Sequence, residues 1–304
     1  MTTNPNQPIL SMRSERRNFI KKSSLLLATG LINNPFFAHS ISRKTYTVGE
    51  VMDLFITQIP EAPFPQTVDT LKTGSKEQKV TGIVTTMFAT LTVIRKAIEL
   101  KANFIIVHEP TFYNHADETK WLENDPVYQF KWKLLDEHEI AVWRNHDYVH
   151  SLAIDGVQAG VVKELDWEKY YKQNAVLNIP ETTLGKLISH IKTKMNVPAL
   201  RYVGDLSQKA SKVLLLPGAI GGRRQIDLLM QEKPDVLICG ESPEWETPEY
   251  VRNANEMGEK LGLIVIGHSA SEEGGSEFME KWLKQNTPDI PVFHIPSGNS
   301  LMVK

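Results

Sequence analysis

Short apolar runs rich in β-branched residues alternate with amphipathic helical segments from residue 47 onward. In residues 91–98 the apolar side chains recur on one helical face, and the apolar run 104–107 that follows stops at His108. A second helical segment, 127–139, leads in the same way into the apolar run 140–143. Because this alternation is typical of units in which helices connect parallel strands, the sequence predicts an α/β fold.

The length of the chain indicates two lobes. The chain has 304 residues, of which 41% are hydrophobic, and one hydrophobic core rarely grows beyond about 250–300 residues. The stretch 166–180, with its paired tyrosines and a proline, is interpreted as a connection, after which the helix and strand patterns resume. We therefore expect a first α/β lobe over 45–175 and a second over 176–304, with a last strand that can return to the first lobe.

The first 44 residues look like a targeting segment. Arg16 and Arg17 precede Phe19 and an apolar run, 25–32, and this pattern resembles a twin-arginine export signal. The apolar run is too short to cross a membrane, which needs about 20 residues, so we expect no stable membrane span. We expect a periplasmic protein, or one exported elsewhere by this route. The alternative is a basic N-terminal arm.

Charge and cysteine content exclude several classes of protein. Residues 1–44 carry seven basic side chains and one acid, so the rest of the chain, within a total of −2, carries a formal charge of −8. Nucleic-acid binding relies on clustered Lys and Arg, so we expect no nucleic-acid partner. Cys239 is the only cysteine, which excludes an internal disulfide and a cysteine-rich zinc site. Any metal must be held by His, Asp and Glu.

Three clusters of histidines and carboxylates follow predicted strands, where open α/β sheets place their ligands. Each cluster alone is more often a surface hydrogen bond, but three together favour a metal site, because imidazole and carboxylate suit zinc, iron and manganese. Carboxylates can also bridge two such ions. The clusters are His108 with Glu109, His146 and Asp147 with His150, and His268 with Glu272.

The residues around these clusters carry a family resemblance. Three blocks occur in order: VTGIVTTMFATLTVIRKAIELKANFIIVHEPTFY, then AVWRNHDYVH, then DVLICGE followed by LGLIVIGHSASE. Over residues 47–304 the chain resembles the Nif-three-like family of dinuclear-metal proteins, whose members are often named GTP cyclohydrolase I type 2 homologues. The resemblance implies two divalent ions (zinc, iron or manganese) in a cleft between two α/β lobes. It also implies a ring-shaped homo-oligomer, a hexamer built from dimers.

The chain departs from the family pattern at two positions. Glu109 follows His108 where the family commonly has a second His, and His150 stands where it commonly has Asp. One His has thus become Glu and one Asp has become His, which leaves the formal charge of the ligand set unchanged. Which carboxylate bridges the ions stays open. The resemblance implies five metal ligands: His108, Glu109, His150, His268 and Glu272.

Two residues are candidates for proton transfer. His146 can act as a general base, bind or orient near the metal, or form only a structural hydrogen bond. Glu241 matches an acidic position that follows a strand in the family. The glycine-rich loop 217–222 is either a tight turn or an anion site, and it lacks the Lys-Ser/Thr ending of a nucleotide-binding loop.

These observations predict a dinuclear-metal-dependent hydrolase that acts on a small molecule. The alternative is a non-catalytic metal-binding or assembly protein, in which the ions stabilise the fold and a ring-shaped oligomer. A third interpretation, an α/β binding module without metal, would be favoured if the three clusters were distant from one another in space.

Overall fold

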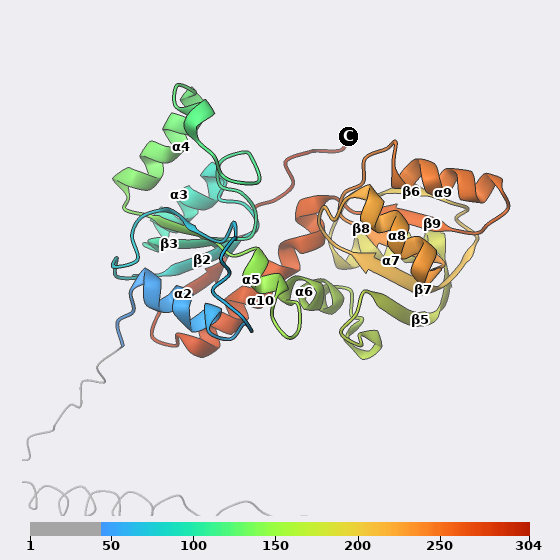
Figure 1. Cartoon of the computed structure of the whole chain (residues 1–304), viewed down its shortest axis with the longest axis horizontal. Coiled ribbons are helices and arrows are strands. Elements are labelled where there is room, and N and C mark those ends of the chain that lie inside the picture. The colour runs from blue at the N-terminus through green and yellow to red at the C-terminus, as the bar shows by residue number, and fades with distance from the viewer. Residues whose placement is uncertain (1–43) are drawn as a thin grey trace, which may run out of the picture. The chain divides into compact units, whose positions relative to one another are not determined.

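The computed structural model describes residues 44–304, so the twin-arginine pattern at Arg16 and Arg17 lies outside the described residues. Two five-stranded sheets with helices on their faces form this part of the chain (Figure 1). The α/β fold predicted from the sequence is therefore confirmed.

The first sheet has the strand order β1-β4-β3-β2-β10. Its central strands β2 (Ile83–Thr86), β3 (Phe104–Val107) and β4 (Ala141–Arg144) are parallel. At one edge β10 (Val292–His294) joins the parallel set beside β2. At the other edge β1 (Leu71–Thr73) pairs antiparallel with β4. The last strand of the chain thus belongs to the sheet that its first part forms.

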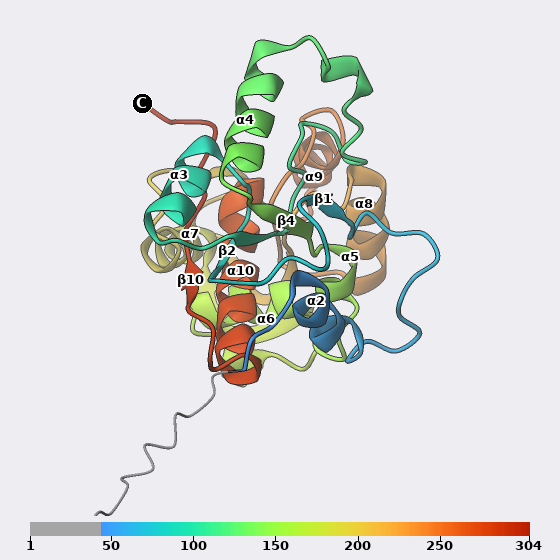
Figure 2. The same cartoon turned by 90° about the vertical axis from the view of Figure 1, so that its left-hand side faces the viewer.

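Helices cover both faces of the first sheet (Figure 2). Phe104 and Ile106 of β3 pack in a core with α2 (Val48–Ile56) and α10 (His268–Asn286). The alternate residues of β3 pack in a second core with α3 (Leu91–Glu99), to which Leu135 of α4 (Pro126–Glu137) also contributes. Because both faces are covered, the strand is apolar throughout rather than alternating.

The second sheet has the order β5-β7-β8-β9-β6, with β7, β8 and β9 parallel and both edge strands antiparallel. Helices α6 and α7 contribute to the core on one of its faces, and α8 and α9 to the core on the other. The strands are β5 (Val176–Thr183), β6 (Arg201–Val203), β7 (Lys209–Leu216), β8 (Val236–Cys239) and β9 (Gly262–Val265). The helices are α6 (Gly156–Glu164), α7 (Leu184–Lys194), α8 (Gly222–Glu232) and α9 (Thr247–Glu256).

The predicted connection over 166–180 is partly wrong. It contains a 3-10 turn, Glu168–Tyr170, but β5 already begins at Val176. Leu177 and Ile179 are buried in the second sheet, while Pro180 lies where the pairing with β7 shifts register. Proline cannot donate to a ladder but is tolerated at such an irregular edge, which is why it did not end the strand.

Helix α10 connects the two sheets. It begins at His268, three residues after the end of β9 of the second sheet, and packs against β2 and β10 of the first. It also packs closely against α6, where a Cβ added at Gly160 would come within 2.2 Å of the carbonyl oxygen of Gly274. The first turn of α10 is therefore held at a fixed place beside the first sheet.

Among residues 44–304, no helix has both the length and the apolar content that a membrane crossing needs.

Candidate metal centre

The three predicted clusters come together at the carboxyl ends of parallel strands. His108 and Glu109 directly follow β3, and His146 follows β4. His268 opens α10 after β9, and Glu272 lies one turn further along the same helix. Oε2 of Glu272 is 3.3 Å from Nε2 of His108 and 3.0 Å from Nε2 of His268, so these two nitrogens are at most 6.3 Å apart. The interpretation that required distant clusters is therefore not supported.

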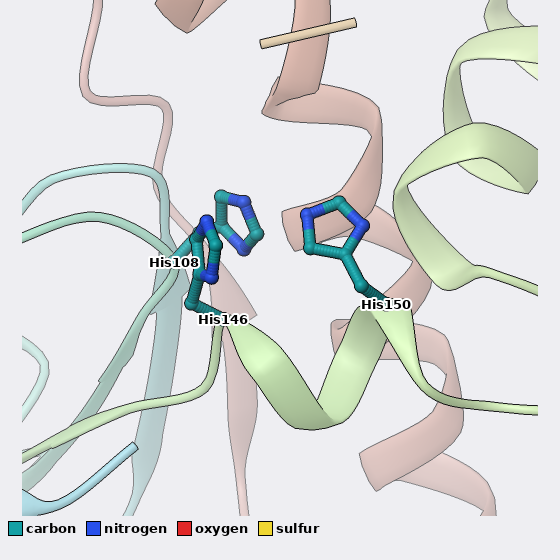
Figure 3. A group of neighbouring side chains, drawn as sticks. All are labelled: His108, His146 and His150. Carbon is teal, nitrogen blue, oxygen red and sulfur yellow. The ribbon is translucent and has the colours of Figure 1, made fainter. Parts of the chain in front are cut away.

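Three histidines form one half of the site (Figure 3). His108 follows the end of β3, whereas His146 precedes the short helix α5 (Asp147–His150) and His150 is its last residue. The rings of His108 and His146 stack with centroids 4.7 Å apart, and His150 meets both rings edge-on at 5.1 Å. One ligand atom of each residue lies within 4.8 Å of the others. His146 therefore lies among the candidate ligands themselves and not only behind them.

Carboxylates form the other half of the site. Oε1 of Glu109 lies 3.3 Å from Nε2 of His268 and 3.7 Å from Nε2 of His146. Ligand atoms about 2.0–2.2 Å from one ion, at tetrahedral or octahedral angles, are about 3.0–3.5 Å apart, so these spacings fit a shared cation. Nε2 of His108 is buried, and although it lies 3.3 Å from Oε2 of Glu272 it makes no hydrogen bond of ordinary geometry. The donor set and this buried nitrogen thus both suit a metal, although the ligand assignment itself stays a prediction.

Each histidine is held through its other ring nitrogen. Nδ1 of His146 lies 2.9 Å from Asp147, and Nδ1 of His150 lies 2.9 Å from Asp155. Nδ1 of His268 lies 3.1 Å from Glu241. Nδ1 of His108 faces the carbonyl oxygen of Asn145 at 3.4 Å. Carboxylate and carbonyl partners of this kind fix the tautomer of a ligating histidine and leave Nε2 available to the metal.

Two of these carboxylates change the sequence-based assignments. Asp155 was not identified from the sequence, although it stands five residues after His150 and caps α6. Glu241, proposed for proton transfer, is more than half exposed and contacts Nδ1 of His268, on the side of the ring away from Glu109 and Glu272. This placement favours an orienting role for Glu241.

The site drives the pKa values of its histidines apart. Burial and the charge of His108 lower the pKa of His146 to about 4. Burial would also lower the pKa of His268, but hydrogen bonds to Glu109 and Glu272 outweigh it and raise that pKa to about 10. Burial would raise the pKa values of both glutamates, yet the neighbouring histidines lower them. The position between the two carboxylates therefore favours a positive charge.

A buried arginine, Arg144, which was not identified from the sequence, pairs with one carboxylate oxygen of Glu109. Arg144 is fully buried at the end of β4 and donates from Nε to the carbonyl oxygen of His108 at 3.2 Å. Its Nη1 donates to the carbonyl oxygen of His115, and its Nη2 lies 3.4 Å from Oε2 of Glu109. A carboxylate oxygen of Asp117 lies 3.8 Å from Nη1, so the buried guanidinium has two carboxylate partners, Glu109 and Asp117. Because Oε2 faces Arg144, Glu109 presents Oε1 to the histidines.

A cavity of about 550 Å³ opens beside the cluster. Glu109, Glu272, His146, His150 and His268 contribute to its wall, together with His115 and parts of the segments 171–175 and 216–220. The candidate ligands are thus accessible to a small molecule from one side.

The glycine-rich loop packs against this site as a tight turn. Gly218 has a φ of 71°, and a Cβ there would lie 2.0 Å from Oε1 of Glu272, so only glycine permits this approach. The backbone N–H of Gly222 at the start of α8 is already hydrogen-bonded within the protein, because it donates to Oε2 of Glu246 at 3.0 Å. This arrangement favours the turn over the anion site.

Comparisons with known proteins agree with this fold. The family model Duf34/NIF3 (NGG1p interacting factor 3) matches residues 67–299, so the chain belongs to this family. A Clostridium acetobutylicum protein named GTP cyclohydrolase 1 type 2 homolog is 26% identical over 227 residues, 70% of this chain and 80% of that protein. The crystal structure of a Bacillus cereus protein related to NIF3 superposes with a TM-score of 0.67 at 16% identity, covering 86% of this chain and 99% of that one. Staphylococcus aureus protein SA1388 gives a TM-score of 0.66 at 19% identity, with 85% and 98% covered.

Proposed function

We propose that this member of the DUF34/NIF3 family is a dinuclear-metal-dependent hydrolase of a small molecule. The observation that carries the proposal is the arrangement of four histidines, each held at Nδ1 by an oxygen, around two buried glutamates. The candidate ligands fall into two groups that overlap at His108, and the proposal of two ions follows from the family resemblance rather than from this overlap. The proposed ions are zinc, iron or manganese, which accept imidazole and carboxylate ligands.

The residues of the chain have separate tasks in this proposal. A divalent ion at the cluster would lower the pKa of a bound water toward neutrality and polarise the group under attack. Glu109 and Glu272 supply the negative charge, and Asp147, Asp155 and Glu241 orient the rings. With a pKa lowered to about 4, His146 is neutral at pH 7 and its Nε2 can coordinate or accept a proton.

The cavity favours catalysis over a purely structural metal site. Structural sites are closed by protein ligands, whereas catalytic sites keep a position open for water or substrate. Here His146, His150, His268 and both glutamates contribute to the wall of the cavity, so the candidate ligands are not sealed from solvent. A non-catalytic metal-binding or assembly protein remains the alternative outcome of the test.

The test combines metal analysis with a hydrolase substrate panel. Purified protein should contain about two divalent ions per chain, lose hydrolysis after chelation, and regain it when metal is restored. His146→Ala should slow turnover by about 10²–10⁴-fold if this residue is the general base. Hydrolysis that survives complete removal of metal would refute the proposal. A metal-loaded wild type that turns over no substrate, but loses stability without metal, would support the structural alternative.

Two further proposals concern assembly and location. We propose that the chain forms a ring-shaped homo-oligomer, a hexamer built from dimers, which analytical ultracentrifugation can test. We also propose that it is exported by the twin-arginine route, because of Arg16 and Arg17 ahead of the apolar run 25–32. Export of this kind carries folded proteins, so an exported metalloenzyme can be loaded with metal in the cytoplasm first.

A further inference from the structure

The wall of the cavity beyond the candidate ligands has a distinct composition. One part offers phenol and amide groups, from Tyr171, Gln173 and Asn174. Amide side chains both donate and accept hydrogen bonds, so they match a ligand that presents N–H and C=O together. Another part is mainly apolar and comes from the end of β7 and the loop that follows it, where Leu216, Pro217, Ala219 and Ile220 line the space.

No lysine or arginine lines this cavity within residues 44–304. Lys172 is exposed between two wall residues but is not part of the wall. Arg223 is 92% exposed and lies 3.4 Å from Asp227 on its own helix. Proteins hold phosphate and carboxylate groups with Arg and Lys, and this wall offers neither.

The N-terminus of a helix is the other place where proteins commonly bind anions, and here a side chain of the protein already occupies it. The start of α8 borders the wall at Ile220, but Glu246 accepts the hydrogen bond of the Gly222 N–H there. A carboxylate of the protein thus occupies the place that a ligand phosphate would use. Asp155 adds another negative charge to the wall.

We propose that the cavity selects small uncharged molecules that carry a cyclic amide, and that its wall beyond the candidate metal ligands disfavours a phosphate or carboxylate elsewhere on the ring. This inference rests on the proposed hydrolase function and names its class of substrate. The amide would meet Tyr171, Gln173 and Asn174, and the apolar face of the ring would lie on Pro217 and Ile220. In the reaction, the oxygen of water bonds to the ring carbonyl carbon, the C–N bond breaks, and the leaving nitrogen takes a proton. The second proton of the water is released when the new acid ionises, so the product is one opened chain that carries a carboxylate and an amine, or a carboxylate and a terminal carbamoyl group when the ring is dihydrouracil or hydantoin.

A matched pair of ring compounds tests the selection directly. Dihydrouracil is an uncharged cyclic amide, and dihydroorotate is the same ring with one added carboxylate. Binding of each to the metal-loaded protein is measured by calorimetry, and ring opening is followed separately by ultraviolet absorbance. We expect dihydrouracil to bind at least about tenfold more tightly than dihydroorotate, since the added carboxylate, held away from the ions, meets a part of the wall that offers no Lys or Arg and carries Asp155. Hydantoin, a second uncharged ring amide, and inorganic phosphate extend the comparison.

A charge-insertion variant sharpens the test. Ala219 is an exposed wall residue, so Ala219→Lys places a cation in the cavity without disturbing the core. We expect this variant to improve dihydroorotate binding by about tenfold relative to dihydrouracil. Ala199→Lys, at an exposed alanine outside the wall, is the matched control and should change neither ligand.

The outcomes separate this inference from the proposed function. Binding of the uncharged rings without any hydrolysis would support the selection and overturn the hydrolase. Preferential hydrolysis of dihydroorotate would support the hydrolase and overturn the selection, and equal binding of the two rings would overturn the selection alone. Failure of both dihydrouracil and hydantoin to bind would also overturn it.

Discussion

Removal of the charge on Glu109 gives the sharpest test of the site. In Glu109→Gln the side chain keeps its shape but loses its negative charge. Oε1 then no longer attracts a cation beside His268, and Oε2 no longer neutralises Arg144, which is fully buried. The variant therefore should lose metal and, even without metal, should lose stability.

The contacts of Arg144 set the size of the stability loss. Breaking a buried ion pair from one side costs about 3–5 kcal/mol, because the remaining charge is left unpaired. Arg144 retains two carbonyl acceptors and Asp117 at 3.8 Å, so we expect about 3 kcal/mol, the lower end of that range. The folded protein lowers the pKa of Glu109 below 4.5. The contribution of the ionised Glu109 side chain to the free energy of unfolding is therefore present above pH 4.5, and it is lost as the pH falls through the lowered pKa of the folded state.

The assay is urea unfolding with a chelator present, paired with elemental analysis of protein purified without one. Glu137→Gln is the matched control, because Glu137 is exposed and pairs only with Lys133 one helical turn away. Such exposed helix pairs contribute about 0.3–0.5 kcal/mol, and the control should keep its metal. Full metal occupancy in Glu109→Gln, or a stability loss no larger than that of the control, would refute the reasoning.

Three other predictions follow from the same structure. The pKa of His268 is raised to about 10, so below that pH a metal ion must displace a proton from this side chain to bind there. Calorimetry in two buffers should therefore detect proton release on metal binding at pH 7.5, and the metal affinity should weaken as the pH falls. Burial and the charges of Glu277 and Glu273 raise the pKa of Glu164 from 4.5 to about 7, so ionisation of this side chain destabilises the fold increasingly above pH 4.5 and fully above pH 7. Urea unfolding should therefore show Glu164→Gln to be more stable than wild type by about 1–2 kcal/mol at pH 8, after allowance for partial exposure, but not at pH 4. Replacing both Arg16 and Arg17 by Lys should keep the precursor in the cytoplasm, and equal periplasmic amounts of variant and wild type in fractionation would contradict the export proposal.

The sequence was most informative where burial is complete on both sides. The predicted strand 104–107 coincides with β3, because a strand covered on both faces is apolar at every position and ends at the first polar residue. The same rule located His108 and His146 at strand ends. Strand β5 was missed because it lies at a sheet edge, where Pro180 and exposed polar positions interrupt the pattern.

The charged residues that contact the candidate ligands, Asp155 and Arg144, could not be predicted in the same way. Asp155 contacts His150 only because the loop after α5 returns to start α6, and no local spacing specifies that return. Arg144 ends an apolar strand, where a charged residue is normally interpreted as the first solvated position. Its burial depends on acceptors supplied by the segment 108–117, far from it in sequence.

The position of α10 links the stability of the fold to occupancy of the site. His268 and Glu272 lie one turn apart at the start of this helix, while His108, Glu109 and His146 follow strands β3 and β4 of the first sheet. A cation held by both sets would join the end of β9 to the ends of β3 and β4. A ligand that binds only the folded state stabilises it by about 4 kcal/mol at a concentration 1,000 times its dissociation constant. Without the cation, Glu272 reaches the end of β3 through its 3.3 Å contact with Nε2 of His108. Metal binding and the packing of α10 on the first sheet are therefore expected to be coupled.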